Sequence, residues 1–166
     1  MKTGVLSILF FFQFSLIFSQ DETLRKLFFA AQTEQAKKDF YSYCVNLPNK
    51  TNTQVAYSGV AAAMYAEVAS NVSDKLEFFN TGKGIIEKSI ARDSYNPELR
   101  FLRFSVQEKA PRMLGYSGNM EEDADLIYYA LTHGFANKNE NYWATVIKFI
   151  SSSGLSESTK SKFKNL

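Results

Sequence analysis

The middle of the chain reads Leu99-Arg100-Phe101-Leu102-Arg103-Phe104-Ser105-Val106-Gln107-Glu108. Apolar side chains occupy most of the circumference of a helix built on this stretch, so neighbouring elements must bury it. The residues before it, Asn96-Pro97-Glu98, are typical of a helix start, because proline is favoured at the first helical position. We therefore predict a central, buried helix over residues 97–108.

One polar stripe interrupts this apolar helix. Arg100, Arg103 and Gln107 are spaced i, i+3 and i+7, which places them on the same face. Two guanidinium groups on a buried helix need partners, because an unpaired buried charge is costly. Acidic side chains that could supply them occur earlier in the chain and at a later helix start: Glu67, Glu121, Glu122, Asp123 and Asp125.

The stripe has three interpretations from sequence alone. The first is a structural ion-pair network that joins the central helix to its neighbours. The second is an anion pocket, in which Arg100 and Arg103, with Gln107 beside them, bind a carboxylate or phosphate of a ligand through forked hydrogen bonds. The third is a stripe that faces solvent. We favour the network and keep the pocket as the alternative.

The remainder of the chain is predicted to be helical too. Apolar residues recur three and four apart, and no stretch shows the sustained alternation of a half-buried strand. Short connections favour antiparallel neighbours. The sequence thus predicts an all-α fold, an antiparallel helical-hairpin array of about six helices. The expected helices span 22–44, 53–70, 74–92, 97–108, 120–133 and 140–152.

Two local features refine this expectation. Small residues at Ala56, Gly59, Ala63 and Ala66 form a stripe on the 53–70 helix, which predicts close contact with another helix. Candidate capping residues precede three of the helices, because their side-chain oxygens can accept from free backbone N–H groups. They are Thr51 or Asn52, Ser73 or Asp74, and Asn119.

The first twenty residues have the pattern of a secretory signal peptide. Lys2 gives a positive start, Val5 to Phe18 is almost wholly apolar, and Ser19 is a small residue at the exit. The alternative, a retained membrane anchor, needs about 20 apolar residues, and this run is shorter. We expect a signal peptide over 1–19, an all-helical domain over 20–154, and a polar, Lys-rich, weakly helical tail over 155–166.

Composition excludes several classes of function. A net charge of +2 leaves no large basic field for nucleic acid. One cysteine and one histidine, Cys44 and His133, are too few for a zinc site, and their dyad would require two distant helices to meet. We expect Cys44 to be a buried apolar residue. The sequence therefore predicts a protein that is not an enzyme and has no metal and no cofactor.

The same composition bears on location. No disulfide framework is possible with one cysteine, and Phe, Lys, Asn and Ile are abundant, which favours export in a Gram-negative bacterium. No second long apolar run follows the leader, so we expect no membrane span after its cleavage. The expected location is periplasmic or extracellular.

Part of the chain resembles a tetratricopeptide-type (TPR-like) helical hairpin. The resemblance rests on Gly59, on Ile86-Glu87-Lys88-Ser89-Ile90-Ala91-Arg92-Asp93 and on Asn96-Pro97-Glu98. Ser89 and Ser94 stand where the repeat favours alanine and proline, and one unit covers about a quarter of the chain. The whole chain also resembles a family of small secreted bacterial helical proteins with no assigned activity. That resemblance is carried by residues 99–108, Leu114-Gly115-Tyr116 and the acidic helix start after it.

These observations lead to two hypotheses for function. The first is a non-enzymatic interaction module that binds a protein or peptide partner, with exposed tyrosines as candidate anchors. The second is a small-ligand or enzymatic pocket centred on Arg100 and Arg103. A structure distinguishes them by whether both guanidinium groups are buried against carboxylates or line an open cavity.

Overall fold

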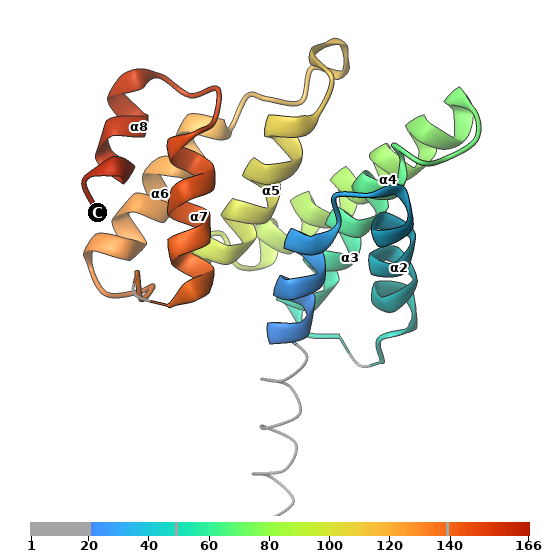
Figure 1. The fold of residues 1–166 in the computed structure, drawn as a ribbon, viewed down its shortest axis with the longest axis horizontal. Coiled ribbons are helices and arrows are strands. Elements are labelled where there is room, and N and C mark those ends of the chain that lie inside the picture. The colour runs from blue at the N-terminus through green and yellow to red at the C-terminus, as the bar shows by residue number, and fades with distance from the viewer. Residues whose placement is uncertain (1–20, 49, 139) are drawn as a thin grey trace, which may run out of the picture.

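The protein is all-helical over the residues that its computed structural model describes, which are 21–48, 50–138 and 140–166 (Figure 1). The all-α prediction is confirmed, whereas the predicted signal peptide lies outside the described residues. The first helical segment comprises residues 21–30. The others are α2 (Glu34–Asn46), α3 (Asn52–Tyr65), α4 (Val72–Arg92), α5 (Pro97–Lys109), the short 3-10 turn η1 (Arg112–Leu114), α6 (Met120–Thr132), α7 (Asn141–Ser151) and α8 (Glu157–Lys164).

Helix α5 runs through the middle of the molecule, between α2–α4 on one side and α6–α8 on the other (Figure 1). Leu99, Phe101, Leu102 and Phe104 are fully buried, as the apolar circumference of this helix predicts. Asn96 caps it, and Pro97 is its first residue, as expected. The ring of Phe101 contacts rings from both sides of α5, those of Phe28, Tyr142 and Phe149.

The predicted single helix over 22–44 is wrong, because the chain turns at residues 31–33. The Thr33 hydroxyl accepts from the Ala36 backbone N–H at 3.2 Å and so caps a new helix, α2. The turn folds α2 back on the first helical segment, which brings the rings of Phe28 and Phe40 to 6.4 Å. A continuous apolar pattern on both sides of Thr33 concealed this break.

Helices α3 and α4 pack closely through glycine. A Cβ atom on Gly82 would overlap the carbonyl oxygen of Gly59 and lie 2.7 Å from the backbone nitrogen of Ala63. The predicted close contact on the small-residue stripe is thus with α4. The cap of α3 is Thr51, one of the two predicted residues, whereas α4 is capped by Asn71 and not by Ser73 or Asp74.

The expected weakly helical tail forms helix α8 and packs on α6. Ser156 caps it by accepting from the Thr159 backbone N–H at 3.2 Å. Its one aromatic side chain, Phe163, is 1% exposed and contacts the ring of Tyr128. The Lys-rich composition obscured the two residues that indicate a packed helix, the capping Ser156 and the apolar Phe163. None of the described helices is long and apolar enough to span a membrane.

The thiol of Cys44 is buried in α2, as expected. Burial raises its pKa from an ordinary 9.0 to about 12. We therefore expect no reaction with a thiol reagent at pH 8 until denaturant is added, measured by absorbance with Ellman's reagent. Because the folded pKa is the higher one, this thiol also lowers stability as the pH rises from 9 to 12. Full labelling of the native protein within minutes would contradict the burial.

Candidate functional site

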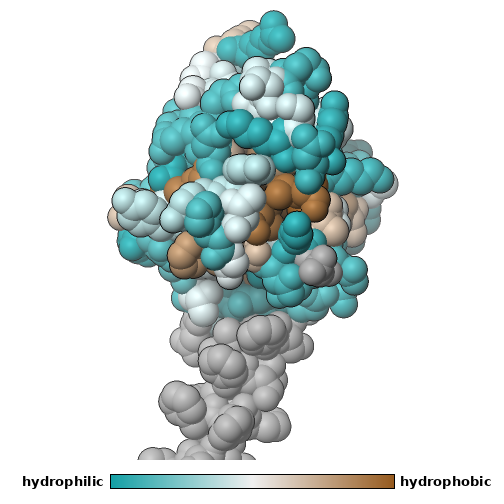
Figure 2. Space-filling view, turned by 90° about the vertical axis from the view of Figure 1, so that its left-hand side faces the viewer, coloured by the Kyte–Doolittle hydropathy of each residue, from teal (hydrophilic) through white to brown (hydrophobic). Residues whose placement is uncertain are grey.

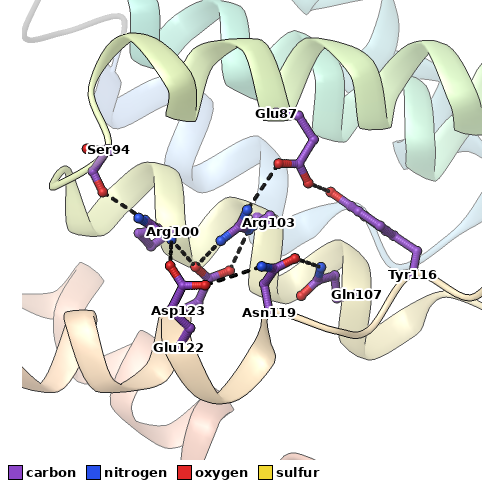
Figure 3. A network of polar contacts seen from close by, with 9 residues as sticks. All are labelled: Glu87, Ser94, Arg100, Arg103, Gln107, Tyr116, Asn119, Glu122 and Asp123. Atoms are coloured by element: carbon purple, nitrogen blue, oxygen red, sulfur yellow. Dashed lines mark hydrogen bonds and ion pairs between the residues drawn. The ribbon is translucent and has the colours of Figure 1, made fainter.

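The predicted polar stripe of α5 lies against the N-terminal turn of α6, in a network of polar contacts (Figure 3). Its centre is Asp123, which is fully buried. Arg103 donates to both carboxylate oxygens of Asp123, from Nε at 2.8 Å and from Nη2 at 2.6 Å. The remaining nitrogen, Nη1, donates to Glu87 of α4 at 3.0 Å. All three nitrogens of Arg103 are therefore bound within the protein.

Arg100, one helical turn before Arg103, binds the same carboxylate. Its Nη1 donates to Asp123 at 3.0 Å and to Glu122 at 2.8 Å, and its Nε donates to the carbonyl oxygen of Ser94 at 2.8 Å. The Ser94 carbonyl belongs to the connection between α4 and α5. The network thus joins three successive helices, α4, α5 and α6.

The outer part of the network uses neutral groups. Tyr116 donates from its hydroxyl to Glu87 at 2.7 Å. Gln107 donates weakly to Asn119 at 3.4 Å, and Asn119 donates to Glu122 at 3.2 Å. Asn119 therefore does not cap α6 through its side chain, contrary to the prediction. The Gln107 Oε1 atom is buried without a hydrogen-bond partner among the described residues.

Burial and neighbouring charges shift the pKa values of these groups in opposite directions. Burial raises the pKa of Asp123, and the guanidinium groups of Arg103 and Arg100 lower it by less. Burial lowers the pKa of Arg103, but its bonds to Asp123 and Glu87 raise it further, so the guanidinium stays charged. The hydrogen bond from Arg100 lowers the pKa of the exposed Glu122. Burial and ion pairing therefore oppose each other at Asp123, the carboxyl at the centre of this internally paired cluster.

Of the five acids considered as partners, Glu122 and Asp123 join the network. Glu67 pairs with Lys37, Glu121 accepts from Thr159, and Asp125 pairs with Lys162. Glu87 was missed, because it lies on a different helix and no spacing rule relates it to Arg103. Carboxylates bind all three guanidinium nitrogens of Arg103 and the Nη1 atom of Arg100, so an anionic ligand would compete with them for these donors. A ligand-binding role for Arg100, Arg103 and Gln107 stays a prediction.

A second, partly buried ion pair holds the first helical segment to α5. Arg25 donates to both oxygens of Glu98, from Nε at 2.9 Å and from Nη2 at 2.5 Å. Tyr57 of α3 donates to the same carboxylate at 2.7 Å. The Arg25 guanidinium stacks 4.3 Å from the centre of the Tyr142 ring of α7. This contact was not predicted, and it holds the helical segment that also carries Phe28 and Phe29.

A groove of about 700 Å³ opens at the end of the molecule where α5 finishes and α4 begins. Its walls come from the first helical segment, α3, α4, α5, η1 and α7, and most of its lining is apolar. No sequence pattern predicted it, because it is formed by the ends of elements that lie far apart in the chain. Its main apolar lining residues are Phe28, Phe29, Val60, Ala63, Met64, Val72, Leu76, Phe79, Val106, Met113, Leu114 and Phe149.

Apolar side chains continue from this groove onto its rim. Val72 and Leu76 of α4 are 73% and 44% exposed, and Met113 of η1 is 91% exposed. They belong to a small set of large apolar side chains that are exposed in the described chain. The side of the molecule formed by α6–α8 is mostly hydrophilic, with its largest hydrophobic area near the middle and smaller ones beside it (Figure 2).

The charges on the rim are mainly positive. Lys75 and Lys109 line the groove, and Arg112 is exposed beside Met113. Among the described residues none of these three cations has an ion-pair partner. Lys109 lies 5.7 Å from the centre of the Phe149 ring. The carboxylate that lines the groove, Glu67, is paired with Lys37.

Within residues 21–48, 50–138 and 140–166, no group of three or more His, Cys, Asp or Glu side chains is placed to hold a metal ion. Comparisons of the chain with family models, with curated proteins and with solved structures give no match.

Proposed function

We propose that this protein is a non-enzymatic interaction module, which binds an apolar segment of a partner protein in the groove between α4, α5 and the first helical segment. The exposed apolar rim carries this proposal. Large apolar surfaces that stay in contact with water commonly mark interaction sites. Burying Val72, Leu76 and Met113 under a partner would remove that contact and supply binding free energy.

A partner protein fits the rim better than a small molecule does. The groove volume, about 700 Å³, is within the range of small-ligand sites, which usually enclose most of the ligand surface. A ligand confined to the groove would cover only part of Met113, which lines the groove and is 91% exposed. A polypeptide that lies across the opening would cover it. For the same reason we place the binding surface here rather than at Arg100 and Arg103.

The arrangement and the location belong to this proposal as well. We propose that the helices form TPR-like hairpins, supported by the glycine contact between α3 and α4 and by the Asn96-Pro97 start of α5. We also propose that the module is exported and works in the periplasm or outside the cell, supported by the leader pattern of residues 1–19. An envelope or secreted protein would then be its partner.

Two acidic substitutions on the rim test the proposal. We expect V72E/M113E to reduce capture of the partner from the cells that make this protein by at least about tenfold, which corresponds to 1.4 kcal/mol. Charged side chains there would keep water on the rim. Stability should hold, because both residues are exposed and a glutamate at the start of α4 favours the helix. Quantitative affinity capture measures the loss.

The control is V45E/F135E, which changes exposed apolar residues outside the groove. It should leave capture unchanged, and thermal melts should show that both double variants remain folded. Equal capture by the wild type and V72E/M113E would contradict the proposed function. So would the absence of any specifically captured protein.

A further inference from the structure

We infer that the segment bound in the groove is an amphipathic α-helix with acidic residues beside its apolar face. This inference rests on the proposed function and identifies the kind of partner. It is argued from two features of the groove, the hydrogen-bonding groups of its lining and the charge of its rim.

The lining has few free hydrogen-bonding groups for the backbone of a bound segment. Apart from the cations Lys75 and Lys109, the polar side chains of the lining already make contacts within the protein. Ser105 donates to the carbonyl oxygen of Leu102, Gln32 donates to that of Phe29, and Glu67 pairs with Lys37. An extended peptide would lose water from its N–H and C=O groups without replacement, which is costly. An α-helix satisfies these groups internally and presents only side chains.

The walls also exclude the usual mode of binding an extended peptide. Strand addition needs the free edge of a sheet, and the described part of the chain contains no strand. The groove is instead walled by helices, with apolar residues of α4 on one side and of α5 and η1 on the other. Such walls accept the apolar face of another helix through side chains spaced i, i+3, i+4 and i+7.

The positive charge of the rim favours a partner with acidic residues. Lys75 and Lys109 line the groove, and the exposed Arg112 directly precedes the rim residue Met113 in the chain. Acidic residues flanking the apolar face of a helix would complement them. A second copy of this chain, docked by twofold symmetry, would bring the same cations together, which disfavours self-association through this face. A flat anionic bilayer would meet the cations but could not fill the groove.

The test uses four designed peptides of about 18 residues, long enough to form a helix on binding. The first has leucines at helical spacing with glutamates beside them. The second replaces the glutamates by lysines, the third has the first composition in a strand-like alternation, and the fourth carries a central proline. Fluorescence anisotropy gives affinities, and circular dichroism gives the helix content of the bound peptide. Vesicles containing anionic lipid form a separate arm.

We expect the first peptide to bind at least tenfold more tightly than the other three and to gain helix content. V72E/M113E should weaken its binding at least tenfold, and V45E/F135E should not. The charge reversal K75E/R112E should invert the preference, so that the lysine peptide binds better than the glutamate peptide. Both residues lack ion-pair partners among the described residues, so this variant should remain folded.

The failures of the two proposals are distinguishable. The strand-like or proline peptide could bind as tightly as the first, with V72E/M113E abolishing that binding. The inference of a helical partner would then be wrong, and the groove would still be the binding surface. Tighter binding to vesicles than to every peptide would overturn the inference in favour of a membrane. If no peptide binds, the inference is also overturned, and the capture experiment alone decides the proposed function.

Discussion

Replacing Arg103 by methionine is expected to lower the free energy of unfolding by about 3–5 kcal/mol, the usual effect of removing one partner from a buried ion pair. Asp123 is fully buried and accepts two hydrogen bonds from Arg103. Without them its charge keeps only the single bond from Arg100. A domain of this size loses about 2–4 °C per kcal/mol, so the melting temperature should fall by about 10 °C.

Arg92→Met is the matched control, because Arg92 is exposed at the end of α4 and has no ion-pair partner in the described ranges. It should change stability by less than about 0.5 kcal/mol. The double variant R103M/D123L should recover much of the loss, because it removes both members of the pair. A shift for Arg103→Met no larger than that of the control would refute the structural role of the network.

The second large effect is expected at Gly82. An alanine there should destabilise the fold by at least about 1–3 kcal/mol, the range for overpacked cores. Its Cβ atom would overlap the Gly59 carbonyl and approach the Ala63 nitrogen, and backbone atoms on a packed helix cannot rotate away. The helix preference for alanine offsets only about 0.5–1 kcal/mol of this cost.

Gly84 provides the control two residues further along α4. A Cβ atom there would meet nothing within 4 Å. Gly84→Ala should therefore stabilise the protein by about 0.5–1 kcal/mol, since it restricts the unfolded chain without a clash. Urea denaturation of the two variants measures both changes in the free energy of unfolding, which should have opposite signs. If Gly82→Ala were as stable as Gly84→Ala, the close approach of α3 and α4 would be incorrect.

The features that the sequence predicted best are those that depend on one helix at a time. The apolar circumference of α5, its Asn96 cap and the shared face of Arg100 and Arg103 all follow from spacing along a single element. Acidic partners at the start of α6 could also be named, since only one short connection separates them from α5. The wrong boundary at Thr33 arose where two helices with similar apolar patterns meet in a tight turn.

The features that escaped prediction require the arrangement of helices in space. Glu87 reaches Arg103 from α4, and Arg25 reaches Glu98 from the first helical segment, and no fixed spacing relates either pair. The groove is a stronger case, because its lining comes from the ends of helices and from η1. The residues that matter there, such as Met113, read in sequence as ordinary loop residues.

The central claim, that the groove is the binding surface, can be tested in the cells that make this protein. A photo-crosslinking amino acid replaces Met113 on the groove rim or, as the control, Phe135 outside the groove, both of which are exposed. We expect one specific crosslinked partner from position 113 and none from position 135. The attached peptide should lie in an amphipathic segment with acidic residues beside its apolar face. Equal crosslinking from both positions, or none from position 113, would contradict the assignment of the groove as the binding surface.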